Sequence, residues 1–351
     1  MARIGEFCSG YVVAWAFLTD MKFDIFQLHF STDLPFIHPP TFLKPLRQAN
    51  ILGPQYTAPS SEQASAVRPP ASTEFLLAFL ALTARFHPKI VAHHSPPTAG
   101  HLSNPLVGSE FYASAASARI KAINGEKLGI YDLETIQAIL MLSLHDWGMN
   151  RGAQAWACLG TAIRSAQALG LHYESDHDNL TSARTIPVMT EERPSMPVSG
   201  RDSAHAGSSN DAFVQAEIRR RTFWTCFIMD RYLSDGKYRP SAINMKDIRI
   251  QLPASEQAFL FGAKVRTLML GEDADTPRVE VQLQRRASLI GEVLNGGVKR
   301  TSFSANGLGG LAEEEQCKVE VGAEEGLVSR YIRILDVYSR VVKWSCGGGL
   351  K

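Results

Sequence analysis

Apolar residues recur every three or four positions through much of the chain, and this spacing predicts α-helices with one or more buried faces. The clearest helix follows Asp132, which can cap it, and apolar residues then cover almost every side. The same spacing predicts further helices over residues 153–169, 217–233, 277–294 and 329–344. Because only residues 146–152 connect the Asp132 helix to the next one, we expect these two helices to pack antiparallel.

The ends of these helices carry their own signals. The helix over 153–169 is followed by Gly170, which can adopt the left-handed conformation, and by the apolar Leu171. Pro277 opens a later helix, as prolines in a first turn often do. The last helix is predicted to place one apolar stripe in line: Tyr331, Leu335, Tyr338 and Val342.

Alternation of polar and apolar residues, which is typical of strands, is nearly absent. Ile248, Ile250 and Leu252 alternate with polar residues, but the run ends at Pro253, so we predict an all-α fold. Stretches rich in Pro, Gly, Ser or charged residues predict loops over residues 53–73, 88–108, 174–211 and 296–326. We expect residues 174–211 to be a disordered insert, because few of them could offset the entropy of ordering.

Composition narrows the class of protein. The 351 residues include 36 basic and 35 acidic side chains, and the formal net charge of +1 argues against binding nucleic acid by phosphate neutralisation alone. The 5 cysteines are too scattered for a disulfide framework or a zinc site. The longest uncharged apolar run, residues 75–84, is shorter than the roughly 20 residues that cross a bilayer, so we expect no membrane association.

Motifs for catalysis or metal binding are weak. The glycine-rich segment over residues 307–310 lacks the Lys-Ser/Thr that follows a phosphate-binding loop, so we interpret it as a linker. Four histidines in one predicted loop could meet at a metal ion: His87, His93, His94 and His101. Because no neighbouring Cys, Asp or Glu completes a ligand set, a solvated Pro/His loop is favoured.

Charged residues inside the apolar helices leave two interpretations open. Asp230 and Arg231 can form a pair that fixes the register of the helix, or a pair that contacts a ligand in a helical pocket. Structural pairing is the favoured interpretation. The basic run at residues 219–221 is interpreted as a source of helix-face salt bridges, with Glu217 placed four residues before Arg221, rather than as a DNA contact.

Three segments, in this order and spacing, resemble one known family. They are residues 75–86 (FLLAFLALTARF), residues 137–172 with Gly152, Ala155-Trp156 and Leu169-Gly170-Leu171-His172, and residues 217–232 (EIRRRTFWTCFIMDRY). Residues 36–42 (FIHPPTF) match its usual opening, and Arg239-Pro240 to Pro253 its continuation. The chain therefore resembles the fungal-specific transcription factor domain, or xylanolytic transcriptional activator regulatory domain, of Zn₂Cys₆ zinc-cluster transcription factors.

The resemblance implies a helical regulatory domain that regulates RNA polymerase II transcription in the nucleus. It implies a domain over residues 23–295, an unmatched segment over 1–22, a flexible loop over 296–326, and a C-terminal helix over 327–351 that is a truncated continuation of the domain. In the family, a separate N-terminal zinc cluster binds DNA. The present chain lacks the clustered cysteines, so we expect zinc and DNA to bind only through a missing module, and we expect no DNA-binding residue in this chain.

The resemblance carries over no catalytic residue, so we expect a protein that is not an enzyme. Its expected partners are a small-molecule effector or a co-regulator protein, and the domain could form a dimer. An apolar wall with a few polar groups predicts a regulatory or ligand pocket at Trp156, Phe223, Trp224, Asp230 and Arg231. The alternative is a small-molecule-metabolising enzyme or metabolite-binding protein on the same scaffold. An enzyme would need His145, Asp146, His172 and Asp230 to converge in one cleft.

Overall fold

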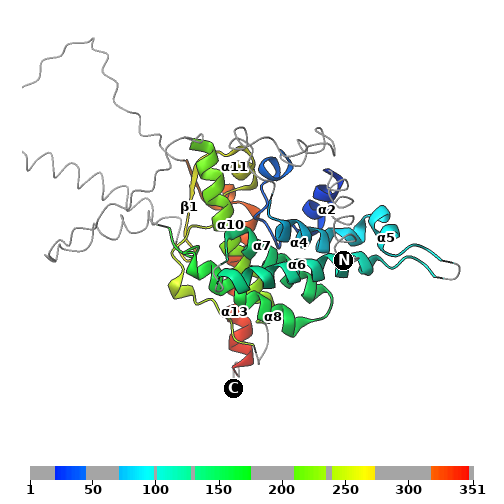
Figure 1. The fold of residues 1–351 in the computed structure, drawn as a ribbon. Coiled ribbons are helices and arrows are strands. Elements are labelled where there is room, and N and C mark those ends of the chain that lie inside the picture. Colours follow the sequence, from blue (N-terminus) through cyan, green and yellow to red (C-terminus); the bar gives the residue numbers. More distant parts are fainter. Residues whose placement is uncertain are drawn as a thin grey trace, which may run out of the picture.

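A computed structural model describes residues 20–44, 71–98, 101–127, 131–174, 209–234, 239–272 and 318–347. Helices dominate these ranges (Figure 1), as the all-α prediction requires. Four of them form a bundle: α4 (Thr73–Thr83), α6 (Pro105–Lys127), α7 (Leu133–Gly148) and α8 (Gly152–Ala168). Within it, α4 packs against both α6 and α7, and α7 packs against α8.

Helices α4 and α7 are the interior of this bundle. Every residue from Glu74 to Thr83 is buried, and so is every residue from Thr135 to Asp146. A helix that is apolar on all sides is stable only when neighbours cover all of it. The sequence therefore predicted the burial of α7 correctly. No single helix in the described ranges combines the length and apolarity of a membrane span, although the segments Thr73–Phe86 and Pro88–His94, bent by 100°, do so together.

The predicted ends of α7 and α8 are confirmed. The side chain of Asp132 accepts a hydrogen bond from the backbone N–H of Thr135 at 2.9 Å. Gly170 has a φ of +67°, and its N–H and that of Leu171 donate to the carbonyls of Gln167 and Ala166. This pair of bonds is the Schellman arrangement, which satisfies carbonyls that the end of α8 would leave unpaired.

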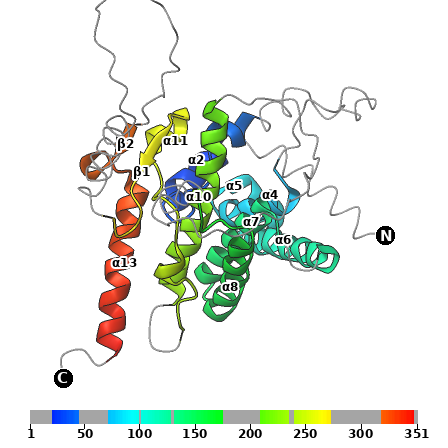
Figure 2. The ribbon, with the colours of Figure 1, turned by 90° about the vertical axis from the view of Figure 1, so that its left-hand side faces the viewer.

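Helix α10 (Ser209–Leu233) crosses the bundle and contacts α7 and α8 on one side and α13 (Leu327–Cys346) on another. It begins eight residues before the predicted start at Glu217. Figure 2 shows α13 lying alongside α10. Residues Phe223 to Arg231 of α10 are all buried. The apolar residues among them belong to the same core as the buried residues of the bundle and of α13.

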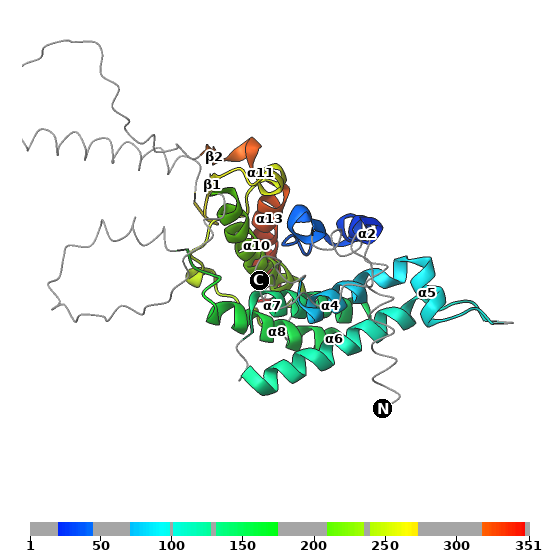
Figure 3. The same ribbon diagram turned by 45° about the horizontal axis from the view of Figure 1, so that its top comes forward.

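Short elements complete the fold. One end of α10 lies beside α11 (Glu256–Phe261) and a parallel pair of strands, β1 (Val265–Thr267) and β2 (Lys318–Glu320). Helices α2 (Asp20–Phe30) and α5 (Pro88–His94) lie at another side of the molecule (Figure 3), where Phe26 stacks on Phe79 of α4 at 5.1 Å between ring centroids. Three 3₁₀ turns, η1 (Ala84–Phe86), η2 (Met245–Asp247) and η3 (Gly322–Glu324), connect these elements.

One loop prediction is wrong, and a second is contradicted at the end that the structure describes. Residues 88–108 contain α5 and the start of α6, because Pro88 and Pro105 occupy first turns instead of breaking helices. Of the loop predicted over 296–326, residues 296–317 lie outside the described ranges, and the remainder contains β2 and η3. No local sequence pattern predicts the pairing of β2 with β1. The strand-like run at 248–252 forms only isolated bridges, from Arg249 to Tyr173 and from Gln251 to Met269.

The stripe predicted for the last helix is rotated. The buried residues of α13 are Val328, Ser329, Ile332 and Leu335, whereas Tyr338 is 48% exposed. Apolar residues also lie on other faces of α13, where Ile334, Val341 and Trp344 are exposed, so the spacing alone does not identify the buried row. Contact with α10 decides between the rows.

Several predictions fall partly or wholly outside the described residues. The helix over 277–294 and most of the loop over 53–73 do so, as does the N-terminal segment up to residue 19. Of the insert predicted as disordered, residues 175–208 lie outside the described ranges. Its margins are ordered, since Glu174 bonds to Arg220 and α10 starts at Ser209. The division of the chain into domains stays a prediction.

Candidate functional site

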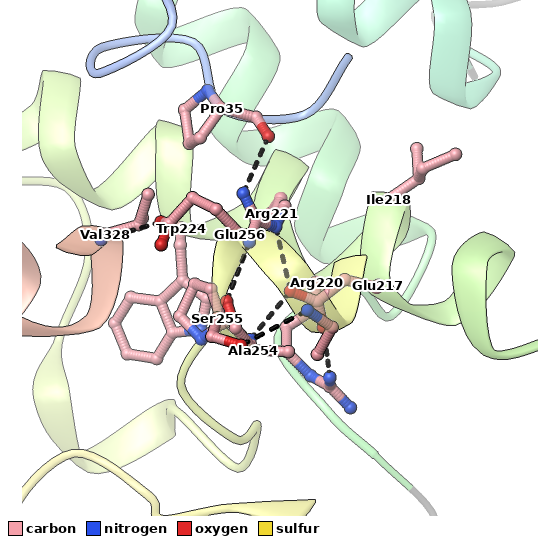
Figure 4. Close-up of polar contacts among 12 residues, drawn as sticks. Pro35, Glu217, Ile218, Arg220, Arg221, Trp224, Ala254, Ser255, Glu256 and Val328 are labelled. Carbon is pink, nitrogen blue, oxygen red and sulfur yellow. Dashed lines mark hydrogen bonds and ion pairs between the residues drawn. The ribbon is translucent and has the colours of Figure 1, made fainter. Parts of the chain in front are cut away.

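A buried ionic cluster at the N-terminal half of α10 is the most heavily bonded group of charges that the structure describes (Figure 4). The carboxylate of Glu217, whose side chain has no exposed area, accepts from Arg221 Nε at 2.9 Å and from Arg220 Nη1. It also accepts from the backbone N–H of Ala254 at 2.8 Å. The pairing follows from helix geometry, because residues three and four apart share one face.

The two arginines also bond to three other segments of the chain. Arg221 donates to the carbonyls of Ala254 at 2.7 Å and Pro35 at 3.3 Å. Arg220 donates to Glu174 at 2.7 Å. Burial alone would lower the pKa of Arg220, but the carboxylates of Glu217 and Glu174 raise it. The basic run predicted as a source of salt bridges is therefore built into the interior and is not free to contact DNA through Arg220 or Arg221.

A second ionic group lies at the C-terminal end of α10. The carboxylate of Asp230 accepts from Arg231 Nη1 at 2.9 Å and from the backbone N–H groups of Ala242 at 2.9 Å and Ile243 at 3.1 Å. Arg231 Nη2 donates to the carbonyl of Ile243 at 3.2 Å, and its guanidinium lies 4.3 Å from the ring centroid of Phe227. The pair thus fixes the segment after the helix, as the structural interpretation expects.

The structure brings together only part of the predicted pocket. Asp230 and Arg231 touch, while Phe223 and Trp224 are enclosed in the core, where Trp224 Nε1 donates to the carbonyl of Gln251 at 2.7 Å. Trp156 lies on α8 and is 36% exposed. Arg231 borders a cavity of about 310 Å³ between α10 and α13 that local sequence patterns do not predict. None of Trp156, Phe223 or Trp224 lines that cavity.

The four residues of the enzymatic alternative make separate sets of contacts. His145 and Asp146 share Arg151, whose Nη2 lies 2.7 Å from Asp146 Oδ1. His172 lies against the ring of Phe223, and Asp230 is engaged as described above. Hydrogen bonds from Arg151 and His145 outweigh burial and lower the pKa of Asp146, although burial is the largest single influence. Bonds of this kind hold a carboxylate in a structural role.

Two of the four histidines, His93 and His94, lie in α5 and make ring contacts. His94 bonds to Tyr112 at 3.0 Å, and its ring lies 5.1 Å from that of His93. Among the described residues, no three His, Cys, Asp or Glu side chains gather as a set of metal ligands.

Comparison with known proteins identifies a family whose profile matches most of the chain. The profile described as "Fungal specific transcription factor domain" matches residues 23–277. The Zn(2)-C6 fungal-type transcription factor FTF1c of Fusarium oxysporum f. sp. lycopersici is 35% identical over 172 residues, which cover 48% of this chain and 16% of that protein. Two transcriptional regulatory proteins of Schizosaccharomyces pombe, C1327.01c and PB1A11.04c, are 33% and 29% identical over 52% and 59% of this chain and 15% and 25% of their own lengths. No solved structure matches the chain.

Proposed function

Because the chain belongs to the fungal specific transcription factor domain family, we propose that it is the regulatory domain of a zinc-cluster transcription regulator and acts in the nucleus. The observation that carries the proposal is the match over residues 23–277, which takes in the bundle and all of α10. The chain spans about a sixth of the Fusarium relative, so the activity of a whole regulator comes to it only as part of this proposal.

The proposed action is regulatory and not catalytic. Asp146, Asp230 and Glu217 are each held by arginines or backbone N–H groups, which leaves them poorly placed to move protons for a substrate. A helical domain with two packings, biased by a small effector or by a co-regulator protein, is the physical mechanism that we propose. A dimer is compatible with this mechanism.

Zinc and DNA enter the proposal only through a zinc-cluster module that the 351 residues do not include, because their 5 cysteines are scattered. The present chain alone should therefore bind DNA weakly and without sequence preference. A gel-shift assay at about 0.15 M salt, where exposed charges are largely screened, tests this point.

The regulatory function is tested by tethering. The full chain is fused to an unrelated DNA-binding module and expressed in a fungal cell that carries a reporter gene with sites for that module. We expect reporter transcript levels several-fold away from those of the module alone, and we expect Glu217→Gln to remove the difference. A fusion that enters the nucleus, accumulates to normal levels and leaves the reporter unchanged would contradict the proposal.

A further inference from the structure

The cavity between α10 and α13 has the composition of an anion site. It has a volume of about 310 Å³, is partly open to solvent, and is lined by the end of α10, residues 239–241 and the C-terminal half of α13. Three of its lining residues are cationic, namely Arg231, Arg239 and Lys343, and none of the described residues that line it is Asp or Glu. The volume is at the small end of the range for ligand pockets, which suits a metabolite better than a polymer.

Two of these cations have no counter-ion in the part of the chain that the structure describes. The charge of Arg231 is offset by Asp230, 2.9 Å away. Across the described ranges, neither Arg239 nor Lys343 forms an ion pair; Lys343 Nζ donates instead to Ser241 Oγ at 2.9 Å. A cavity with two uncompensated positive charges attracts a negatively charged ligand.

Arg231 also presents an unused donor. Its side chain is 4% exposed, and its two Nη groups donate to Asp230 and to the carbonyl of Ile243. Its Nε–H is buried and finds no acceptor among the described residues. A buried donor without an acceptor is costly, and in folded proteins such groups usually face a bound molecule or water. This atom belongs to a residue that lines the cavity.

Arg239 is held in a position that is itself unfavourable for a cation. A Cβ placed on Gly152 would lie 3.3 Å from Arg239 Nη1, so the guanidinium packs against the first residue of α8. The N-terminus of a helix carries partial positive charge, and α8 has no side-chain cap there. The guanidinium of Arg239 therefore lies close to a partial positive charge and also lines the cavity between α10 and α13. Gly152 leaves the space that lets Arg239 approach.

We propose that this cavity binds a small organic anion that carries a carboxylate or phosphate group. Arg239 and Lys343 pair with the anionic group, and the hydroxyl of Ser234 or Ser241 supplies a hydrogen bond, while Arg231 adds positive charge to the wall. The aliphatic side chain of Val342 contacts the remainder of the ligand. Because α10 and α13 each form one wall, an occupied cavity draws these two helices together.

Direct binding to the purified full chain tests the proposal without any transcription assay, so its outcome is independent of the tethering experiment. The probes are inorganic phosphate and four- to six-carbon dicarboxylic acids, titrated by calorimetry and thermal shift at fixed ionic strength. Response to phosphate alone, or to the dicarboxylates alone, supports the site and identifies the anionic group. If no probe binds at concentrations up to about 10 mM, the free energy of binding is weaker than about 3 kcal/mol, and this result overturns the proposal.

Variants separate this site from adventitious ion binding. Loss of one charge-assisted contact is worth roughly tenfold or more in affinity, so Arg239→Gln and Lys343→Gln should each weaken binding by at least that factor. Lys343 is exposed, so its variant keeps the fold even if that of Arg239 does not. Lys246→Gln, at an exposed position that does not line the cavity, is the matched control and should bind as the wild type does. Equal affinities in all three variants would overturn the proposal.

Discussion

At the scale of single residues, Glu217 is the clearest link between sequence and fold. Its carboxylate has no exposed area and accepts from Arg220, Arg221 and the N–H of Ala254. Since α10 supplies the carboxylate and both guanidiniums, helix geometry alone places these three side chains on one face. It then fixes the segment around residue 254 against α10, and Arg221 adds a bond to Pro35.

We predict that Glu217→Gln lowers the free energy of unfolding by about 3–5 kcal/mol, because it leaves two buried guanidiniums without a full counter-charge. Urea denaturation of the purified chain measures the loss. Asp247→Asn removes a carboxylate from an exposed position and should change stability by no more than about 0.5 kcal/mol. A loss below about 1 kcal/mol for Glu217→Gln would show that solvent reaches the cluster.

His38 makes stability depend on pH. Burial lowers the pKa of its imidazole and Arg221 lowers it further, against the opposing influence of the Leu260 carbonyl and of Asp211. Below about pH 6.5 His38 becomes protonated in the unfolded chain, whereas in the folded chain its lowered pKa keeps it neutral. The free energy of unfolding therefore falls as the pH falls. His94, whose pKa burial also lowers, contributes in the same direction.

We therefore expect the wild type to lose stability between pH 7 and pH 5.5, and His38→Gln to lose less over the same interval. One proton sets an upper limit of about 1.4 kcal/mol per pH unit on the difference between their slopes. Unfolding free energies at several pH values provide the measurement. His101→Gln, at an exposed position, should keep the wild-type slope. Identical slopes in His38→Gln and the wild type would mean that His38 titrates normally in the folded state.

At the scale of elements, one glycine within helix α8 and one just beyond its end have opposite roles. Gly160 lies in the middle of the helix, whereas Gly170 has a φ of +67° beyond its end, and nothing lies within 4 Å of a Cβ built on either. An added methyl group would therefore meet no neighbouring atom at either position, and the two positions differ only in backbone conformation.

Gly160→Ala should stabilise the chain by about 0.5–1 kcal/mol, because alanine loses less backbone entropy in a helix. Gly170→Ala should destabilise it by about 1–2 kcal/mol, because the left-handed conformation places a Cβ against the backbone. Thermal unfolding of the two variants side by side gives both signs. The same sign for both would show that the end of α8 can adopt another conformation.

Helix ends and fully buried helices were predictable because their signals are local. Asp132, Gly170 and the apolar residues of α7 each act on neighbours within one or two turns. The cavity was not predictable, because Arg231, Arg239 and Lys343 meet only when α13 lies beside α10. The buried stripe of α13 was mispredicted for the same reason. Several faces of this helix carry apolar residues, and contact with α10 determines which of them is buried. The prediction of a loop over 88–108 was wrong because proline occurs in the first turn of helices as well as at helix breaks.

At the scale of the whole molecule, α13 is joined to the rest through residues 253–256. Ser329 Oγ donates to the carbonyl of Pro253 at 2.6 Å, and the carboxylate of Glu256 accepts from the N–H of Leu327 at 3.2 Å. Residue 254 is also the point at which the Glu217 cluster bonds to this segment. The charges inside α10 and the placement of α13 are therefore coupled through a few backbone groups.

Gly326 tests this coupling because it lies at the closest approach of the two segments. A Cβ on Gly326 would be 2.8 Å from Ser255 Cα and 3.0 Å from the carbonyl oxygen of Ala254, both parts of the backbone. Gly326→Ala must therefore push α13 away from residues 254–255. We expect amide hydrogens of α13 to exchange at least several-fold faster, while those of α7, in the bundle interior, keep their wild-type rates.

Gly148→Ala, where nothing lies within 4 Å of the added Cβ, serves as the control and should leave α13 unchanged. If Gly326→Ala accelerates exchange equally in α7 and α13, the domain opens as one cooperative unit, and an effector could not move α13 without unfolding the bundle. If exchange rises in α13 alone, the helix can shift against a stable bundle. That second outcome is the one a regulatory domain with two packings requires, because only a separable element can be repositioned by a ligand held between it and α10.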